Sequence, residues 1–260
     1  TKAMLKNMEL NPNLTLSDSI TKVLYNNHPL RLRMNVEDYD KVDYAKAMEM
    51  YKDRFADPNN FTFIFVGNID VETFKPLVEQ YLASLKKNRR KENWKDVGLG
   101  ITEGNYTTHY RKEMQDPKTS VYMIYNGDME YNLYNNVYMS ILSDVLDIVY
   151  TKSIREEQGG TYGVGVMGQV NNRPTDEFMF YIVFDTNDEV YATLMDIAKA
   201  GLKDIAENGP RQEDLSKVLE NKLKKRVEQL QENIFWTSVI ESESRDNIDF
   251  VTEYENIIKG

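Results

Sequence analysis

Residues 133–184 read LYNNVYMSILSDVLDIVYTKSIREEQGGTYGVGVMGQVNNRPTDEFMFYIVF, and within this stretch the hydrophobic pattern changes its period. Val137, Ile141 and Val145 recur at helical spacing, which predicts a helix over 133–150. Residues 161–170 and 178–184 are rich in β-branched and aromatic side chains and predict two strands. The Asn-Asn-Arg-Pro sequence between them is typical of a turn, so the two strands are expected to pair.

The flanking residues extend this pattern in both directions. Upstream, alternation over 106–111 and the apolar run over 119–125 predict two more strands. Downstream, the spacing of apolar residues predicts helices over 190–207 and 213–235, with Asn208-Gly209-Pro210 ending the first. Short turns between neighbouring strands favour antiparallel pairing. The order β-β-α-β-β-α-α therefore predicts an α+β fold, with antiparallel-rich sheets and helices packed on one face.

The first part of the chain has its own elements. The run FTFIFV at 61–66 predicts a buried strand, and Asp70 is placed to cap a following helix that reaches about Leu85. A dense basic run, KKNRRK at 86–91, and a glycine-punctuated stretch come next. These features predict three regions: 1–88 as the C-terminal part of a preceding α+β domain, 89–104 as a linker, and 105–260 as a truncated C-terminal α+β domain.

Composition excludes several classes of function. The chain has 260 residues and a formal net charge of −10, which disfavours binding to a nucleic-acid backbone. No apolar run approaches the ~20 residues that span a bilayer, so we expect no membrane span. Cysteine is absent, and the only two histidines, His28 and His109, are too far apart in sequence for a His-x-x-Glu-His motif. We therefore expect no zinc site made by this chain alone.

The most distinctive stretch is Arg155-Glu-Glu-Gln-Gly-Gly-Thr-Tyr-Gly-Val-Gly165. A phosphate-binding loop does not fit, because no Gly-Lys-Ser/Thr follows and the segment leads into a strand rather than a helix. Spacing alone is more typical of a structural corner, in which two glycines allow a tight backbone and Tyr162 packs.

This segment resembles the Arg-Glu-x-x-Gly-x-x-Tyr signature in the C-terminal domain of the pitrilysin/insulinase (M16-type) zinc metallopeptidases. The block FTFIFVGNIDVETFKPLVEQYLASL at 61–85 resembles the same family's strand–Gly–Asn/Asp–helix block, and the helix before Arg155 is in register with it. The resemblance is greatest to the C-terminal half of large bacterial zinc proteases built from two halves, and it implies a pitrilysin-like domain fold.

The resemblance also implies roles for individual residues. Arg155 and Tyr162 match the family's catalytic-site Arg and Tyr, which reach the substrate, while Gly159, Gly160 and Thr161 fall at substrate-binding positions. Zinc in the full-length parent would be bound outside this chain, by an N-terminal half that is its implied partner. The implied substrate is a peptide. The chain begins at Thr1 within a helical pattern, and we expect it to be an inactive fragment of a longer protein.

These expectations define a function and one alternative. The chain is expected to be the non-zinc-binding, C-terminal portion of a zinc metalloendopeptidase, contributing substrate- and oxyanion-binding residues. The alternative is a non-catalytic, peptidase-like subunit that binds peptide or an active partner. The resemblance implies a location in the bacterial cell envelope or periplasm, with the cytoplasm as the alternative, and the lack of cysteine is compatible with both.

Overall fold

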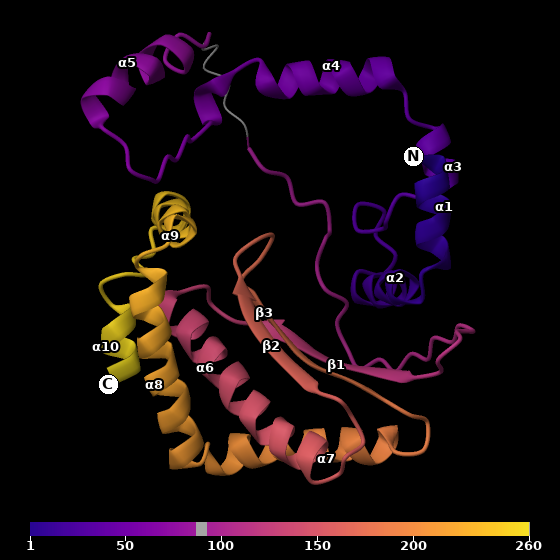
Figure 1. Cartoon of the computed structure of the whole chain (residues 1–260). Helices are drawn as coiled ribbons and strands as arrows, with labels where there is room; N and C mark the ends of the chain where they lie inside the picture. Colours follow the sequence, from indigo (N-terminus) through magenta and orange to yellow (C-terminus); the bar gives the residue numbers. More distant parts are fainter. Residues whose placement is uncertain (87–92, 260) are drawn as a thin grey trace. The chain divides into compact units, whose positions relative to one another are not determined.

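A computed structural model describes residues 1–86 and 93–259, and the chain divides into two compact units, Thr1–Met114 and Gln115–Gly260 (Figure 1). The first unit contains helices α1 (Lys2–Leu10), α2 (Pro12–Leu24), α3 (Val36–Asp40), α4 (Tyr44–Phe55), η1 (Pro58–Asn60) and α5 (Val71–Tyr81). The second contains β1 (Thr119–Asp128), α6 (Leu133–Tyr150), η2 (Thr151–Glu156), β2 (Val164–Asn171), β3 (Glu177–Thr186), α7 (Tyr191–Asn208), α8 (Gln212–Gln229), α9 (Asn233–Asp246) and α10 (Tyr254–Lys259). No helix in the described part of the chain is both long and apolar enough to cross a bilayer.

Side-chain caps begin several helices where the sequence predicts. The Asp70 carboxylate accepts a hydrogen bond from the Thr73 amide at 2.8 Å and starts α5, which ends at Tyr81 rather than at Leu85. The Asn132 side chain accepts from the Asn135 amide at 2.8 Å and starts α6. Because the cap and the apolar period agree, α6 has the bounds predicted from sequence.

Two predicted strands are wrong. Residues 61–66 are not part of any sheet, and Phe61, Phe63 and Phe65 are 38%, 47% and 49% exposed. Residues 106–111 likewise form no strand and are mostly exposed. A strand needs a neighbouring backbone to complete its hydrogen bonds, and no sheet partner lies beside either segment within residues 1–86 and 93–259. Apolar composition identifies a segment suited to a sheet, but it does not provide the partner.

The domain boundary predicted from sequence remains a prediction. Along the sequence, the first compact unit ends at Met114, so residues 105–114 group with the first unit rather than with the second. Most of the basic run, together with the start of the 89–104 linker, lies outside the described residues.

The second unit is built on a three-stranded sheet with the order β1-β3-β2, antiparallel throughout. Val121 of β1 lies opposite Phe184 of the central strand β3, which lies opposite Val164 of β2. The next inward-facing row pairs Met123 with Ile182. This register places one set of apolar side chains on a single face, because side chains alternate along a strand. The predicted α+β class with antiparallel pairing is confirmed.

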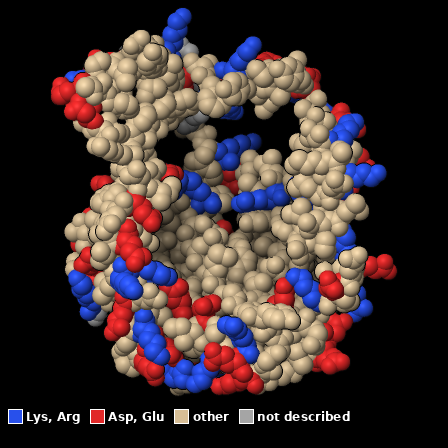
Figure 2. Space-filling model, viewed as in Figure 1, with Lys and Arg blue, Asp and Glu red and all other residues tan. Residues whose placement is uncertain are grey.

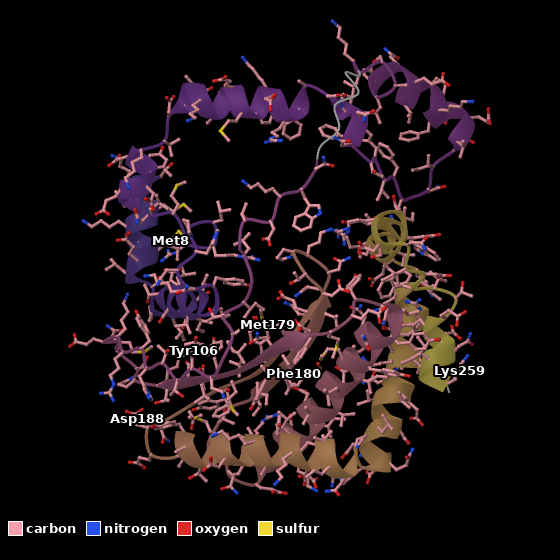
Figure 3. The ribbon with its side chains drawn as sticks, turned by 180° about the vertical axis from the view of Figure 1, so that it is seen from behind. Met8, Tyr106, Met179, Phe180, Asp188 and Lys259 are labelled. Atoms are coloured by element: carbon pink, nitrogen blue, oxygen red, sulfur yellow. The ribbon has the colours of Figure 1, made fainter. Side chains whose placement is uncertain are left out.

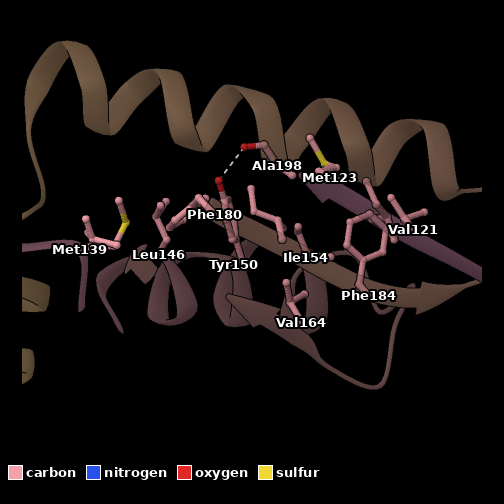
Figure 4. Packing of buried hydrophobic residues seen from close by; sticks show 13 residues of the cluster. Val121, Met123, Met139, Leu146, Tyr150, Ile154, Val164, Phe180, Phe184 and Ala198 are labelled. Carbon is pink, nitrogen blue, oxygen red and sulfur yellow. Dashed lines mark hydrogen bonds between the residues drawn. The ribbon is translucent and has the colours of Figure 1, made fainter. Parts of the chain in front are cut away.

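Helices α6 and α7 cover that face and form the main core with it (Figure 4). Adjacent residues Met179 and Phe180 of β3 are both buried, although they point to opposite sides of the strand (Figure 3). In the core, the Tyr150 hydroxyl donates to the Ala198 carbonyl oxygen at 2.7 Å and joins the end of α6 to α7. The buried apolar residues of this core are Val121, Met123, Met139, Leu146, Tyr150, Ile154, Val164, Val170, Phe180, Ile182, Phe184, Leu194 and Ala198.

The prediction of one long helix over 213–235 is wrong in one respect, because the chain forms two helices there, α8 and α9, separated by residues 230–232. The Trp236 indole Nε1 donates to the Leu230 carbonyl oxygen at 2.8 Å and satisfies the end of α8. The buried Arg226 guanidinium lies 4.5 Å from the ring centre of Phe235 and 4.4 Å from that of Tyr254. The break therefore lets both α9 and α10 pack on one cation from α8.

Charged side chains on the surface of the second unit form hydrogen bonds and ion pairs with one another. Asp246, at the end of α9, accepts hydrogen bonds from Asn172 at 2.8 Å, Arg173 at 2.9 Å and Arg245 at 3.0 Å, which ties α9 to the β2–β3 turn. In Figure 2, basic and acidic atoms are interspersed along the helices in the lower part of the view. This agrees with pairs one helical turn apart, such as Lys217 with Glu213 at 2.6 Å.

Candidate functional site

The corner that carries Arg155 begins where α6 widens into the π-helical turn η2. The Glu157 amide donates to the Lys152 carbonyl oxygen at 3.0 Å, five residues earlier, instead of the usual four. Ile154 is fully buried in the main core and anchors the turn from below. Because its neighbour is held inward, Arg155 projects into solvent.

The two glycines turn the chain from helix to strand. Gly159 has a φ of +61°, a left-handed conformation that disfavours any other residue, and its amide donates to the Arg155 carbonyl oxygen at 3.1 Å. Gly160 lies against α7, where an added Cβ would sit 3.1 Å from Leu194 Cδ1 and 3.2 Å from Val190 Cγ2. The first glycine therefore provides the turn, and the second provides the close approach.

Thr161 and Tyr162 follow at the tip of this corner. The Thr161 hydroxyl donates to the Gly163 carbonyl oxygen at 2.9 Å and accepts from the Gly163 amide at 3.2 Å, which closes a small local turn. Tyr162 is 98% exposed, so it does not pack as a purely structural corner residue would. Neither Tyr162 nor the Arg155 guanidinium has a hydrogen-bonding or ionic partner within the described residues.

All five residues named from sequence therefore lie in one short segment: Arg155 is near the end of η2, and Gly159, Gly160, Thr161 and Tyr162 lie between η2 and β2. The arrangement presents a phenolic donor and a guanidinium to solvent from a corner held at Ile154 and Gly160. A phenol can donate one hydrogen bond to a carbonyl oxygen or an oxyanion, and a guanidinium can bind a carbonyl or carboxylate through its planar fork.

The ring of His28 is not free to bind zinc. His28 Nε2 lies 2.9 Å from the Val97 carbonyl oxygen and so donates to it, while Nδ1 accepts from the Leu30 amide at 3.3 Å. Both ring nitrogens are thus engaged, and no lone pair remains for a metal. Among residues 1–86 and 93–259, no three His, Asp or Glu side chains are grouped as a metal would require. The side chains present do not fit zinc, so no chemistry of this chain is assigned to it.

Two adjoining hollows lie near the corner, with volumes of about 270 and 450 Å³. Both are lined by Lys152 and Arg211, but neither is lined by Arg155 or Tyr162. Arg211 pairs with the buried Asp214 carboxylate at 2.7 Å, so its charge is already neutralised. We therefore place the candidate site at the exposed corner rather than in these hollows.

Residues that support the corner were missed from sequence. Thr186, at the end of β3, donates to the Gly160 carbonyl oxygen at 2.6 Å, and Val190 and Leu194 form the surface that Gly160 contacts. Nothing in the local pattern links these residues to Gly160, because they are neighbours only through the fold. The glycine pair was the one available signal, since it indicates a close backbone approach without naming what is approached.

Comparisons with known proteins agree with this architecture. A protein from Arabidopsis thaliana described as "Zinc protease PQQL-like" is 25% identical over 244 residues, covering 88% of this chain and 25% of that protein. The crystal structure of the periplasmic protease PqqL from Escherichia coli superposes with a TM-score of 0.80 at 18% identity, covering 99% of this chain and 28% of PqqL. A peptidase M16 inactive domain from Pseudomonas fluorescens superposes with a TM-score of 0.70 at 15% identity, covering 99% of this chain and 61% of that one.

The chain spans about a quarter of the length of the first two of these proteins. Residues 41–222 match the family described as "Peptidase M16 inactive domain", which covers more than half of the chain and includes the whole Arg155–Tyr162 corner. On this evidence the chain belongs to the M16 peptidase family, as an inactive domain.

Proposed function

We propose that this chain is the non-zinc-binding, C-terminal portion of a zinc metalloendopeptidase that hydrolyses peptides, and that the corner at 155–162 binds the substrate. The observation that carries the proposal is Tyr162, which is 98% exposed at the tip of a corner anchored at Ile154 and Gly160. The exposed ring offers an apolar surface and the hydroxyl offers a hydrogen-bond donor, so Tyr162 is available to contact a bound peptide.

The proposed chemistry divides between two side chains. When the peptide carbonyl carbon is attacked, negative charge develops on its oxygen, and the Tyr162 hydroxyl donates a hydrogen bond to that oxygen. Arg155 holds a neighbouring carbonyl or carboxylate of the peptide through its guanidinium. Gly159, Gly160 and Thr161 lie between them and let the peptide backbone approach without meeting a large side chain.

The remaining requirements of hydrolysis come, in this proposal, from another part of the same protein. The zinc and the base belong to an N-terminal half, which is the partner of this chain, and the chain alone is inactive. Residues 1–88 belong to the domain that precedes the linker at 89–104, and 105–260 form the domain that carries the corner. An envelope or periplasmic location follows by analogy with PqqL, which is described as periplasmic.

Steady-state kinetics on the full-length protein tests the assignment of Tyr162. We expect Tyr162→Phe to lower kcat by ~10²–10³ with little change in KM, because the lost hydrogen bond forms mainly in the transition state. Tyr138→Phe on α6 is the matched control, since Tyr138 is also an exposed tyrosine and is 55% exposed. Full activity of Tyr162→Phe would remove Tyr162 from the reaction.

Arg155→Lys provides the second test. We expect kcat/KM to fall, because an ammonium group does not reproduce the planar, two-pronged contact of a guanidinium. Arg111→Lys, at an exposed position in the first unit, is the control for loss of an arginine elsewhere. Thermal melting of both Arg155→Lys and Tyr162→Phe should match that of the wild type, because neither side chain packs in the core.

The alternative is a non-catalytic subunit that binds peptide or an active partner. The observation that supports it is the family description of an inactive domain. If the full-length protein hydrolyses no peptide, yet binds an extended peptide with an affinity that falls in Arg155→Lys, this alternative replaces the endopeptidase.

A further inference from the structure

We propose that Thr186 is a positioning residue, whose hydroxyl fixes the loop that presents Tyr162. Its consequence for catalysis rests on the function proposed above for Tyr162. The anchoring itself does not, because it follows from contacts within this chain.

The first contact is a hydrogen bond between distant parts of the sequence. Thr186 Oγ1 donates to the Gly160 carbonyl oxygen at 2.6 Å. Thr186 is the last residue of β3, and β3 is the central strand of the sheet. Thr186 pairs with Thr119 of β1, whereas the pairing of β3 with β2 ends at Phe184, so the donor is fixed to the sheet through β1.

The second contact is the packing of Gly160 on the start of α7. The absent Cβ of Gly160 lets its backbone approach Leu194 and Val190, which would lie only 3.1 and 3.2 Å from that atom. The start of α7 is itself fixed, because the Asn187 side chain accepts hydrogen bonds from the Glu189 amide at 2.9 Å and the Val190 amide at 3.2 Å. Gly160 is therefore held by a donor on one side and by Val190 and Leu194, at the start of α7, on the other.

Tyr162 depends on this anchor because its own side chain has none. Its ring is almost fully exposed, and it makes no hydrogen bond within the described residues. Between Gly160 and Tyr162 there is only Thr161, whose hydroxyl bonds to the Gly163 backbone and makes the tip compact. The backbone direction at Gly160 thus determines where the phenol points.

The first experiment measures the order of the loop directly. Hydrogen exchange is followed at the amides of residues 159–163 in this chain, for the wild type, Thr186→Val and Thr186→Ser. Valine keeps the branched shape and lacks the donor, so we expect exchange to accelerate about fivefold, which corresponds to the loss of one typical hydrogen bond. Serine keeps the hydroxyl and should restore wild-type exchange. Thr193→Val, at an exposed position on α7, is the control.

The second experiment measures the consequence in the full-length protein. We expect Thr186→Val to lower kcat by between about tenfold and a hundredfold with KM nearly unchanged, because a donor displaced by about 1 Å loses its transition-state contact. Thr186→Ser should recover most of that loss. A merely structural role for Thr186 would lower the melting temperature without this separation of kcat from KM.

The outcomes separate the two proposals. Unchanged exchange in Thr186→Val overturns the positioning role, whatever the kinetics show. Faster exchange with full activity, while Tyr162→Phe is impaired, overturns the link between loop order and catalysis. If Tyr162→Phe itself is fully active, the proposed function fails, and the exchange measurement alone decides whether Thr186 anchors the loop.

Discussion

Replacing Gly201 with alanine should destabilise the second unit, although the general rule for helices predicts the opposite. Gly201 lies within α7, well away from its ends at Tyr191 and Asn208. In a helix interior, alanine is favoured over glycine by about 1 kcal/mol, because glycine loses more backbone freedom on folding. The expected reversal comes from one neighbouring side chain.

An alanine Cβ at position 201 would lie 2.7 Å from Tyr150 Cε1, well inside van der Waals contact. The ring has no free direction of movement, because Tyr150 is fully buried and its hydroxyl is bonded to the Ala198 carbonyl oxygen on the same helix. Overpacking a core of this kind costs about 1–3 kcal/mol. Taking about 2 kcal/mol for the overlap and about 1 kcal/mol for the helix gain leaves a net loss of about 1 kcal/mol.

Urea unfolding measures this balance, with Trp236 fluorescence as the probe of the second unit in a Trp94→Phe background. Ala200→Gly, at an exposed position of the same helix, is the control for propensity and should lose about 1 kcal/mol. In a Tyr150→Leu background the overlapping ring atom is absent, so Gly201→Ala should stabilise by about 1 kcal/mol.

The coupling between positions 150 and 201 should therefore be about 2 kcal/mol in a double-mutant cycle. If Gly201→Ala stabilised the wild type, the ring would be free to move aside. The hydrogen bond to Ala198 would then not be holding it, and the reasoning would be refuted.

Three further predictions concern stability of the same unit. Asn132→Ala should cost about 1 kcal/mol in urea unfolding, because α6 loses its N-terminal cap, and an unchanged midpoint would contradict this. Arg226→Met should cost about 1–2 kcal/mol in urea unfolding and accelerate amide exchange in α10, because the contacts of Arg226 with Phe235 and Tyr254 are lost. Unchanged exchange in α10 would show that these two contacts do not stabilise that helix. Burial raises the pKa of Asp246, but hydrogen bonds from Asn172, Arg245 and Arg173 outweigh burial and hold that pKa below its ordinary value. The ionised Asp246 carboxylate therefore stabilises the fold above the unfolded pKa, about 3.9, and this stabilisation is lost as the pH falls through the folded pKa. In Asp246→Asn, the free energy of unfolding should fall less steeply at acid pH than it does in the control variant Glu189→Gln.

Local pattern was enough for elements whose stabilising contacts lie within a few residues. The bounds of α6 follow from its apolar period and from the Asn132 cap, both of which are visible in sequence. The β2–β3 hairpin follows from two apolar runs with a turn between them. The candidate corner was also visible, because the two glycines and the Arg155–Tyr162 spacing occupy one continuous segment.

What depends on distant neighbours was decided only by the tertiary structure. Residues 61–66 have the composition of a buried strand, yet they pair with nothing in the described part of the chain, because pairing requires a second backbone at the right place. The break between α8 and α9 depends on where Trp236 and Arg226 find partners, which no helical period encodes. The anchoring of Gly160 by Thr186 has the same origin. Sequence determines which residues can turn tightly or form a strand, whereas the packing of β3 and α7 determines what those residues meet.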